Sequence, residues 1–336
     1  MQTTGHHHIS MLTKNAQQNN QFYTKVLGLR RVKVTVNQDD PSMYHLFYGD
    51  TTGSPGTELT FFEMPIAGRT TEGTNAINRI ALFVPSYESL VYWQERLQTD
   101  TQITTYANRD ALHFRDLDGL ALVLVNHNSN EAPSTPWDGS DVDADHRILG
   151  MATIEITVRD FTKSLHFLTK LLGYSVIQMK PNEALLRTSN DRYSEIKLVQ
   201  QDGPTQRPGR GSVHHLALRV TDTNTLLAWQ ERLTEAGFVT SGVIDRYYFH
   251  SLYVNDLNGI TYELATDGPD FLRDQSVEQL RAQLDLPPKL EAKRAIIEAK
   301  RAIIEAKRAI IEAKRAIIEA KRAIIEAKLQ PFEELM

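Results

Sequence analysis

The sequence predicts an α+β fold in which four βαβββ modules form two domains with curled mixed sheets, followed by a long C-terminal helix. The first observation is internal repetition, because the segment FYTKVLG at 22–28 returns as FLTKLLG at 167–173 with five of seven positions identical. The segment WQERL at 93–97 returns unchanged at 229–233. The second observation is a run of heptads that starts at Glu291. Together they indicate a duplicated chain with a helical tail.

Each half of the duplication divides again into two modules with the same order of elements. A strand-like run, a helix-like run and several further strand-like runs occur four times, beginning near His6, Asn78, Gly150 and Ser212. Strand-like and helix-like runs are told apart by whether apolar residues recur every second residue or every three to four. The repeated order predicts four modules and two curled sheets.

The helices follow the first strands of their modules. A strand at 78–84 precedes a helix at 89–97, and a strand at 147–158 precedes a helix at 162–172. Glycine suits the end of a helix because it adopts the left-handed conformation without strain. Three of the predicted helices end at such a residue: Gly28, Gly173 and Gly237.

The modules set the predicted domain boundaries. An N-terminal domain covers 1–127 and a C-terminal domain covers 147–270, with two modules in each. The segment 128–146 between them is rich in Asn, Ser, Pro and Asp, which is typical of a linker. Residues 271–336 form the predicted helical tail.

The tail is the simplest part of the sequence. From Glu291 the heptad EAKRAII repeats five times without change, and its residues favour or tolerate helix. Apolar residues recur every seven positions from Ile296 onward, which is the pattern of a coiled-coil seam. We expect a long helix through which the chain can form a homo-oligomer. The alternative is a solvated, charge-laced helix without a partner.

Composition excludes several classes of function. The chain has 336 residues, 41% of them hydrophobic, with a net charge of −5 and no long basic run, so nucleic acid is not an expected partner. No apolar run approaches the ~20 residues that span a bilayer, and the N-terminus lacks a secretory core, so we expect a cytoplasmic protein. The absence of cysteine leaves histidine and carboxylates as metal ligands.

The histidine run GHHHIS at 5–10 has two local interpretations. It is either the remnant of a tag or a set of imidazoles at the start of a strand, because it passes directly into Ile9 to Leu12. Comparison with the last module separates the two. In VHHLALRV at 213–220, alternation places His215 on the face opposite His214 and directs it into the cup of the sheet.

The same alternation predicts partners for His215. Glu263, in the final strand of the last module, shares the cup with it. At the position equivalent to His215 the other modules have Thr153, Arg79 and His8, and of these His8 can bind a metal. Two histidines and one carboxylate with open coordination positions match the facial triad of non-haem Fe(II) oxygenases. The alternative is a pair of structural histidines with a surface glutamate.

At these residues the chain resembles the vicinal-oxygen-chelate superfamily, and within it the two-domain ring-cleaving dioxygenases that act on hydroquinone-type substrates. The resemblance covers residues 5 to about 290 and includes the doubled F-x-T-K-x-L-G segments, HHHIS, VHHLAL and DLNGITYELATD. It implies two vicinal-oxygen-chelate domains and an enzyme that inserts O₂ into a hydroquinone or catechol ring. It also implies Fe(II) or Mn(II) held by His8, His215 and Glu263.

The resemblance also implies a substrate pocket. The first histidine of each pair and a downstream arginine and tyrosine would line it: His7, His214, Arg246 and Tyr253. Tyr253 or His214 would handle the phenolic proton, and Arg246 would steady negative charge on oxygen. Ser10 departs from the threonine common in similar enzymes, which leaves the ring substituents open.

Two rival functions use the same fold. A glyoxalase-type isomerase would complete the metal shell with a second carboxylate, for which Glu58 occupies a plausible strand position and Glu63 is a weaker candidate. A non-catalytic protein that binds small molecules is the other rival. Three protein ligands would favour binding both an aromatic substrate and O₂. We prefer three because the two-domain layout and the segment YELATD at 262–267 look like those of the dioxygenases.

Overall fold

The computed structural model describes residues 1–127, 134–188, 193–280 and 284–333. It separates into two compact units, Met1–Asp285 and Leu286–Met336. Residues 128–133 of the predicted linker and 281–283 of the predicted tail lie outside the described residues.

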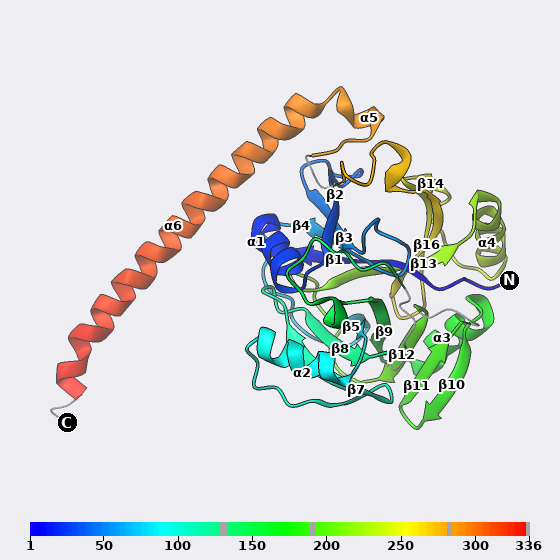
Figure 1. The fold of residues 1–336 in the computed structure, drawn as a ribbon, viewed down its shortest axis with the longest axis horizontal. Coiled ribbons are helices and arrows are strands. Elements are labelled where there is room, and N and C mark those ends of the chain that lie inside the picture. The colour runs from blue at the N-terminus through cyan, green and yellow to red at the C-terminus, as the bar shows by residue number, and fades with distance from the viewer. Residues whose placement is uncertain (128–133, 189–192, 281–283, 334–336) are drawn as a thin grey trace. The chain divides into compact units, whose positions relative to one another are not determined.

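Two eight-stranded mixed sheets form the first unit (Figure 1). The first sheet has the strand order β14-β15-β16-β13-β1-β4-β3-β2. Its strands are β1 (His6–Thr13), β2 (Arg30–Val36), β3 (Tyr44–Gly49), β4 (Glu58–Glu63), β13 (Val213–Val220), β14 (Ile244–Asp245), β15 (Phe249–Asn255) and β16 (Thr261–Pro269). The second sheet has the order β10-β11-β12-β9-β5-β8-β7-β6. Its strands are β5 (Ala76–Val84), β6 (Thr104–Tyr106), β7 (Arg109–Arg115), β8 (Ala121–Asn126), β9 (Gly150–Val158), β10 (Ser175–Lys180), β11 (Glu183–Arg187) and β12 (Glu195–Gln200).

Each sheet combines modules from both halves of the chain. Within a module the first strand pairs in parallel with the last, as in β1 with β4 and β13 with β16. The free edge of each first strand then pairs antiparallel with the first strand of another module, β1 with β13 and β5 with β9. The segments 1–127 and 147–270 therefore describe the duplication in sequence, and neither forms a sheet on its own.

The helices of this unit lie on the outside of the sheets (Figure 1). They are α1 (Ala16–Gln21), continued by a π-helical turn at Phe22–Val26, α2 (Tyr87–Arg96), α3 (Phe161–His166), continued by a π-helical turn at Phe167–Leu171, and α4 (Thr223–Glu235), with short 3₁₀ turns at Ala144–His146 and Phe271–Arg273. Each α-helix begins after a polar side chain that accepts a backbone N–H, which satisfies donors that the helix itself leaves unpaired. These residues are Asn15, Ser86, Asp160 and Asp222.

The repeated segments have a structural reason. Gly28, Gly173 and Gly237 adopt positive φ directly after their helices, as predicted. Trp93 and Trp229 of the WQERL repeats are fully buried between helix and sheet. The duplication therefore preserves the residues that end a helix and those that attach it to its sheet.

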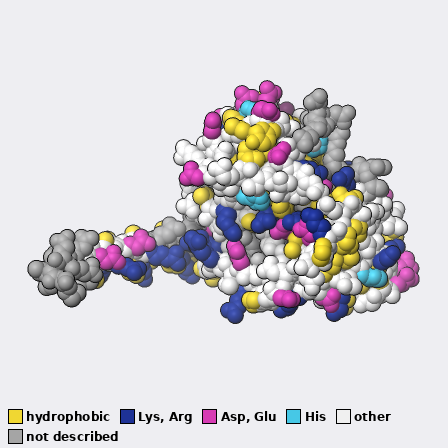
Figure 2. All heavy atoms as spheres, turned by 90° about the horizontal axis from the view of Figure 1, so that it is seen from below, with side chains coloured by type: hydrophobic (Ala, Val, Ile, Leu, Met, Phe, Trp, Pro, Cys, Tyr) yellow, Lys and Arg dark blue, Asp and Glu magenta, His cyan; other side chains and the backbone are white. Residues whose placement is uncertain are grey.

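The second unit contains α5 (Pro288–Glu291) and α6 (Arg294–Glu333), so the predicted long helix is confirmed. Ion pairs one turn apart run along α6, for example Arg301 to Glu305 at 3.4 Å, and Figure 2 shows side chains of both charges on this helix. Ile303, Ile310 and Ile317 are more than half exposed. Self-association through this helix stays a prediction. Every helix among the described residues is too short or too polar to cross a membrane.

Candidate metal centre

Three strands of the first sheet bring His8, His215 and Glu263 together in its cup. Nε2 of His8 lies 3.3 Å from Nε2 of His215. Oε2 of Glu263 lies 3.2 Å from Nε2 of His8 and 2.8 Å from Nε2 of His215. All three side chains are buried. Two of them come from the central antiparallel strands β1 and β13, and the third from β16, which runs beside β13.

The spacing of these three atoms fits a divalent metal. Ligand bonds of about 2.1 Å that meet at right angles place their donor atoms about 3.0 Å apart. The observed separations are 2.8, 3.2 and 3.3 Å. Glu263 Oε2 is buried without a hydrogen-bond donor among the described residues, while Ser251 Oγ donates to its Oε1. The donor set is that of a facial triad with one side left to the cavity.

The charge of Glu263 is stabilised in place. Burial alone would raise the pKa of this carboxyl, but the neighbouring His8, and the imidazole nitrogens of His215 and His8 at 2.8 and 3.2 Å, hold its pKa well below the ordinary value. Burial lowers the pKa of His215, against the opposing effect of Glu263. An ionised carboxylate is the form in which glutamate binds a metal.

Irregular strand pairing explains why adjacent histidines meet on one side. The register between β1 and β13 shifts between His6 and Ile9, and again between Ser10 and Met11 opposite the His214 and His215 pair. A bulge of this kind interrupts the alternation of side chains and re-aims them. Nδ1 of His7 consequently lies 3.0 Å from Nδ1 of His8, and Nδ1 of His214 lies 2.8 Å from Nδ1 of His215.

These contacts select a tautomer for each candidate ligand. Burial lowers the pKa of His7 to about 3 and that of His214 to about 4, so both are neutral near pH 7 and can accept a hydrogen bond. If Nδ1 of His8 and of His215 donates, the lone pair of Nε2 points to the metal position. In that tautomer the first histidine of each pair would orient the second.

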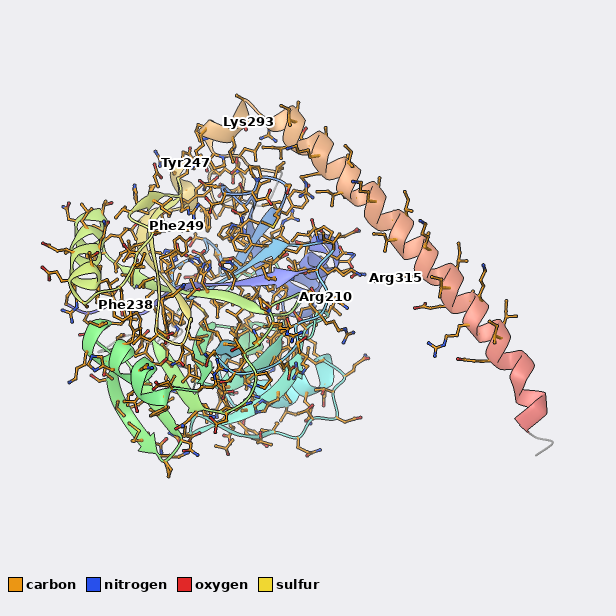
Figure 3. All side chains as sticks on the ribbon, turned by 180° about the vertical axis from the view of Figure 1, so that it is seen from behind. Arg210, Phe238, Tyr247, Phe249, Lys293 and Arg315 are labelled. Carbon is orange, nitrogen blue, oxygen red and sulfur yellow. The ribbon has the colours of Figure 1, made fainter. Side chains whose placement is uncertain are left out.

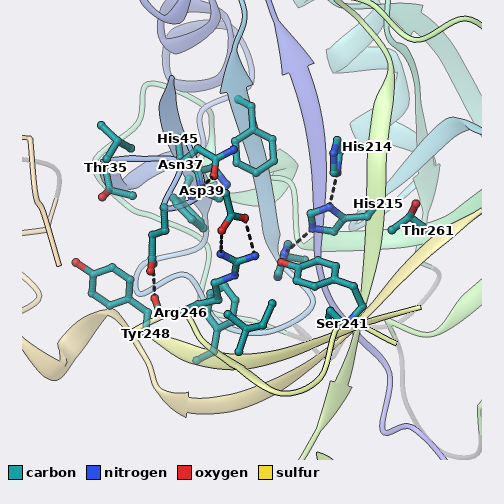
Figure 4. A pocket seen from close by; sticks show the side chains of 18 of the residues that line it. Thr35, Asn37, Asp39, His45, His214, His215, Ser241, Arg246, Tyr248 and Thr261 are labelled. Carbon is teal, nitrogen blue, oxygen red and sulfur yellow. Dashed lines mark hydrogen bonds and ion pairs between the residues drawn. The ribbon is translucent and has the colours of Figure 1, made fainter. Parts of the chain in front are cut away.

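A cavity of about 490 Å³ opens beside this cluster (Figure 4). Aromatic side chains form much of its wall, including Phe47, Phe62, Tyr248 and Phe249. Phe249 on β15, which Figure 3 labels, also packs against the rings of His7 and His8, with ring centroids 5.3 and 5.4 Å apart. The cavity therefore offers flat apolar surfaces next to a candidate metal position, which suits an aromatic ring.

Tyr253 and Arg246 stand at the polar side of the cavity. Tyr253 on β15 pairs across the sheet with Glu263, and its ring lies 5.5 Å from that of His215. Burial, together with the charge of Glu263, raises the pKa of Tyr253, so its phenol keeps its proton near neutral pH. The Arg246 guanidinium lies 5.4 Å from the centre of the Tyr253 ring and forms an ion pair with Asp39.

The predicted pocket residues divide into two groups. His214, Arg246 and Tyr253 line the cavity, as do His8 and His215. His7 does not line it; it is 2% exposed and lies behind His8. Both histidines turn toward their neighbours, but His214 is exposed at the cavity.

The two carboxylates considered for a fourth ligand lie elsewhere. Glu58 is buried next to His7 and His8, with which it forms a second group that could hold a metal, and it does not join the group of His8, His215 and Glu263. Burial, with a smaller effect of Asp50 and Glu263, raises its pKa. Glu63 Oε1 accepts the backbone N–H of Ala16 at the start of α1. Neither position completes the triad.

Two supporting residues give no signal in the sequence. Ser251 fixes Glu263, and Asp39 pairs with Arg246, but a lone serine in a strand and an aspartate in a polar loop are ordinary features. Their proximity to the site arises only from strand register and from the meeting of the first and fourth modules.

The described residues in the cup of the second sheet form no equivalent site. Thr153 and Arg79 occupy the positions of His8 and His215, as the sequence comparison predicted. Thr153 donates to Glu195, which Arg109 also holds at 2.8 Å, while Glu155 pairs with Arg79 at 3.1 Å. Ion pairs between protein side chains fill this cup, so only the first sheet presents the triad among the described residues.

Comparison with known proteins gives a family match. The model of the Glyoxalase/Bleomycin resistance protein/Dioxygenase superfamily matches residues 5–124 and 150–264. The chain is 44% identical over 308 residues to a protein of Bacillus subtilis (strain 168) named "Putative ring-cleaving dioxygenase MhqA", covering 88% of this chain and 98% of that protein. It is 27% identical over 300 residues to the chlorohydroquinone/hydroquinone 1,2-dioxygenase of Sphingobium indicum, covering 85% and 92% of the two chains.

Solved structures agree with this match. The crystal structure of a "putative dioxygenase" from Bacillus subtilis subsp. subtilis str. 168 superposes with a TM-score of 0.84 at 31% identity, over 89% of this chain and 96% of that one. Glyoxalase I from Zea mays superposes with a TM-score of 0.59 at 15% identity, over 83% and 97%. The second likeness concerns the fold alone.

Proposed function

This chain belongs to the Glyoxalase/Bleomycin resistance protein/Dioxygenase superfamily, and on that premise we propose that it is a metal-dependent ring-cleaving dioxygenase acting on hydroquinone-type aromatic compounds. In the proposed reaction one carbon–carbon bond of the ring and the O–O bond of O₂ break, and both oxygen atoms enter the product. No external electron donor is then needed. The partners are a small aromatic substrate and O₂.

One observation supports the proposal most directly: the three-ligand cluster of His8, His215 and Glu263 faces an aromatic-lined cavity. Three ligands leave positions open, which is what distinguishes a site for a substrate together with O₂ from a saturated structural site. The relatives named above include a hydroquinone dioxygenase, which favours this substrate class. We propose Fe(II), or Mn(II), as the resident ion, since either would bring substrate and O₂ together and exchange electrons with them.

The protein's own residues would bind the ring and manage its protons. Phe47, Phe62 and Phe249 would hold the ring by its faces and edges and exclude water. Tyr253 keeps its phenolic proton near neutral pH, so it would donate a hydrogen bond to an oxygen of the substrate. His214 is neutral and lines the same cavity, so it would accept the phenolic proton. Arg246 would steady negative charge that develops on oxygen.

Oxygen consumption tests this function. The protein is loaded with Fe(II) without air, and O₂ uptake is then measured with hydroquinone, methylhydroquinone and catechol while ultraviolet spectra record loss of the ring. The proposal predicts one O₂ consumed per molecule of at least one of these substrates. Absence of uptake with all three, together with turnover of a thiol–aldehyde adduct, would instead assign the chain to the isomerases.

A further inference from the structure

The cavity contains one guanidinium group, that of Arg246, and it already pairs with the carboxylate of Asp39. Among the described residues that line the cavity, Arg246 is the single lysine or arginine. Its Nη1 donates to Oδ1 of Asp39 at 3.0 Å and its Nη2 donates to Oδ2 at 2.9 Å. This two-point geometry matches a planar guanidinium to a planar carboxylate, which makes it the strongest form of such a pair. Figure 4 shows Arg246 reaching Asp39 across the cavity.

The pair joins the two modules that form the first sheet. Asp39 lies in the connection between β2 and β3, and Arg246 follows β14. Beside the pair, Gln38 Nε2 donates to the backbone oxygen of Arg246 at 2.6 Å, and the guanidinium lies over the ring of Tyr253. These two contacts do not involve the carboxylate of Asp39. They would keep Arg246 in place if the charge of Asp39 were removed.

A carboxylate on an aromatic substrate would seek the same guanidinium. Arg246 is 14% exposed, whereas Asp39 is 71% exposed, so the arginine faces the cavity while the aspartate also faces solvent. A ring carboxylate would either have to displace Asp39 or lie close to it, and two nearby carboxylates repel one another. A neutral phenol meets no such obstacle.

We propose that Asp39 is a specificity-determining residue: it occupies the guanidinium of Arg246 and thereby restricts the cavity to aromatic rings that carry no carboxylate. The identity of the reacting ring rests on the proposed function. The selection by charge rests on the cavity alone, so binding to the metal-free protein tests it separately.

Binding of benzoate and phenol to the metal-free protein is measured by titration calorimetry in the wild type and in Asp39→Asn. The asparagine keeps an oxygen that Arg246 can contact but removes the negative charge. Benzoate should bind Asp39→Asn roughly 10-fold or more tightly than the wild type, which is the scale of one charge-assisted contact, and phenol should change less than about threefold. Equal benzoate affinity in the two proteins, or no detectable benzoate binding to the variant, would overturn the proposal.

Two further variants identify the groups involved. Asp40→Asn makes the same chemical change in the same loop, but Asp40 accepts hydrogen bonds from Ser42 and does not contact Arg246, so its benzoate affinity should equal that of the wild type. Adding Arg246→Met to Asp39→Asn should abolish the gain in benzoate affinity. If the double variant retains it, benzoate binds elsewhere and the assignment is wrong.

Turnover links the selection to the reaction. In the metal-loaded protein, the ratio of kcat/KM for 2,5-dihydroxybenzoate to that for methylhydroquinone should rise roughly 10-fold or more in Asp39→Asn. An unchanged ratio in an active variant would contradict the proposal. If the wild type cleaves neither ring and also consumes no O₂ with hydroquinone or catechol, the proposed function fails, and the calorimetric comparison alone decides the role of Asp39.

Discussion

Substitution of His7 separates orientation of a metal ligand from contact with substrate. His7 does not line the cavity, and its Nδ1 lies 3.0 Å from Nδ1 of His8. His7→Phe keeps a ring of similar size but removes the acceptor that selects the tautomer of His8. Loss of such an outer partner typically lowers metal affinity about 10-fold to 100-fold, or about 1.4 to 2.7 kcal/mol.

The exposure of His7 and of His214 predicts how much metal affinity each substitution loses. His7 is 2% exposed, so water cannot replace the missing acceptor, and His7→Phe should approach the 100-fold limit. His214 is exposed beside the cavity, so water can accept the proton of His215 in its place. His214→Phe should therefore lower the affinity for the metal by only about 10-fold.

Competition with a coloured chelator for Zn²⁺ measures these affinities without reference to activity. His7→Asn supplies a side-chain oxygen close to the position of Nδ1 and should restore most of the affinity. Thermal unfolding of the metal-free variants shows whether they remain folded. A folded His7→Phe variant that binds Zn²⁺ as tightly as the wild type would refute the tautomer argument.

Three further changes test separate parts of the site. Tyr253→Phe should retain the metal but lower turnover of hydroquinones roughly 10²-fold, the usual scale for a lost proton donor, and unchanged turnover with an unchanged pH profile would reduce Tyr253 to a packing residue. Glu58→Gln should leave the metal content of the purified protein intact, because Glu58 lies outside the triad; loss of the metal would favour the four-ligand site of an isomerase. His6 is buried with both ring nitrogens unpaired, and burial lowers its pKa to about 3 from an ordinary value of 6.5. The stability it contributes is present above about pH 6.5 and is lost as the pH falls toward 3, so His6→Gln should reduce the dependence of the unfolding free energy on pH between 6 and 4 by about 1.4 kcal/mol per pH unit. Urea unfolding of the metal-free protein measures this dependence, and an equal slope in both proteins would contradict it.

Much of the fold could be predicted because the sequence contains it twice. The repeated helices, their terminal glycines and the heptads correspond to local rules of conformation, and these elements form as expected. The pairing of modules was harder to derive. A repeat shows that two modules are alike, but it does not show which strand edges pair, and here β1 pairs with β13 from the other half of the chain.

The three candidate metal ligands could be predicted from the sequence, but the orientation of the neighbouring histidines could not. His8 and His215 could be matched because they occupy equivalent positions of their first strands, Glu263 was expected to face the same cup, and the structure brings the three together. Strict alternation directed His7 and His214 away from the cup, whereas the shifted register turns each toward its neighbour. A bulge depends on how two distant strands pair, and no residue from His7 to Ser10 indicates it in the sequence.

The proposed activity depends on one metal ion held by His8, His215 and Glu263. The most direct test of this site is metal analysis of the purified wild type, of His215→Ala and of His113→Ala. His113 is a matched control because it belongs to β7 of the second sheet, where protein ion pairs replace the triad. We predict about one Fe(II) or Mn(II) per chain in the wild type and in His113→Ala, and less than about one tenth of that in a folded His215→Ala. Full metal content in a folded His215→Ala would show that His215 is not a ligand of the ion.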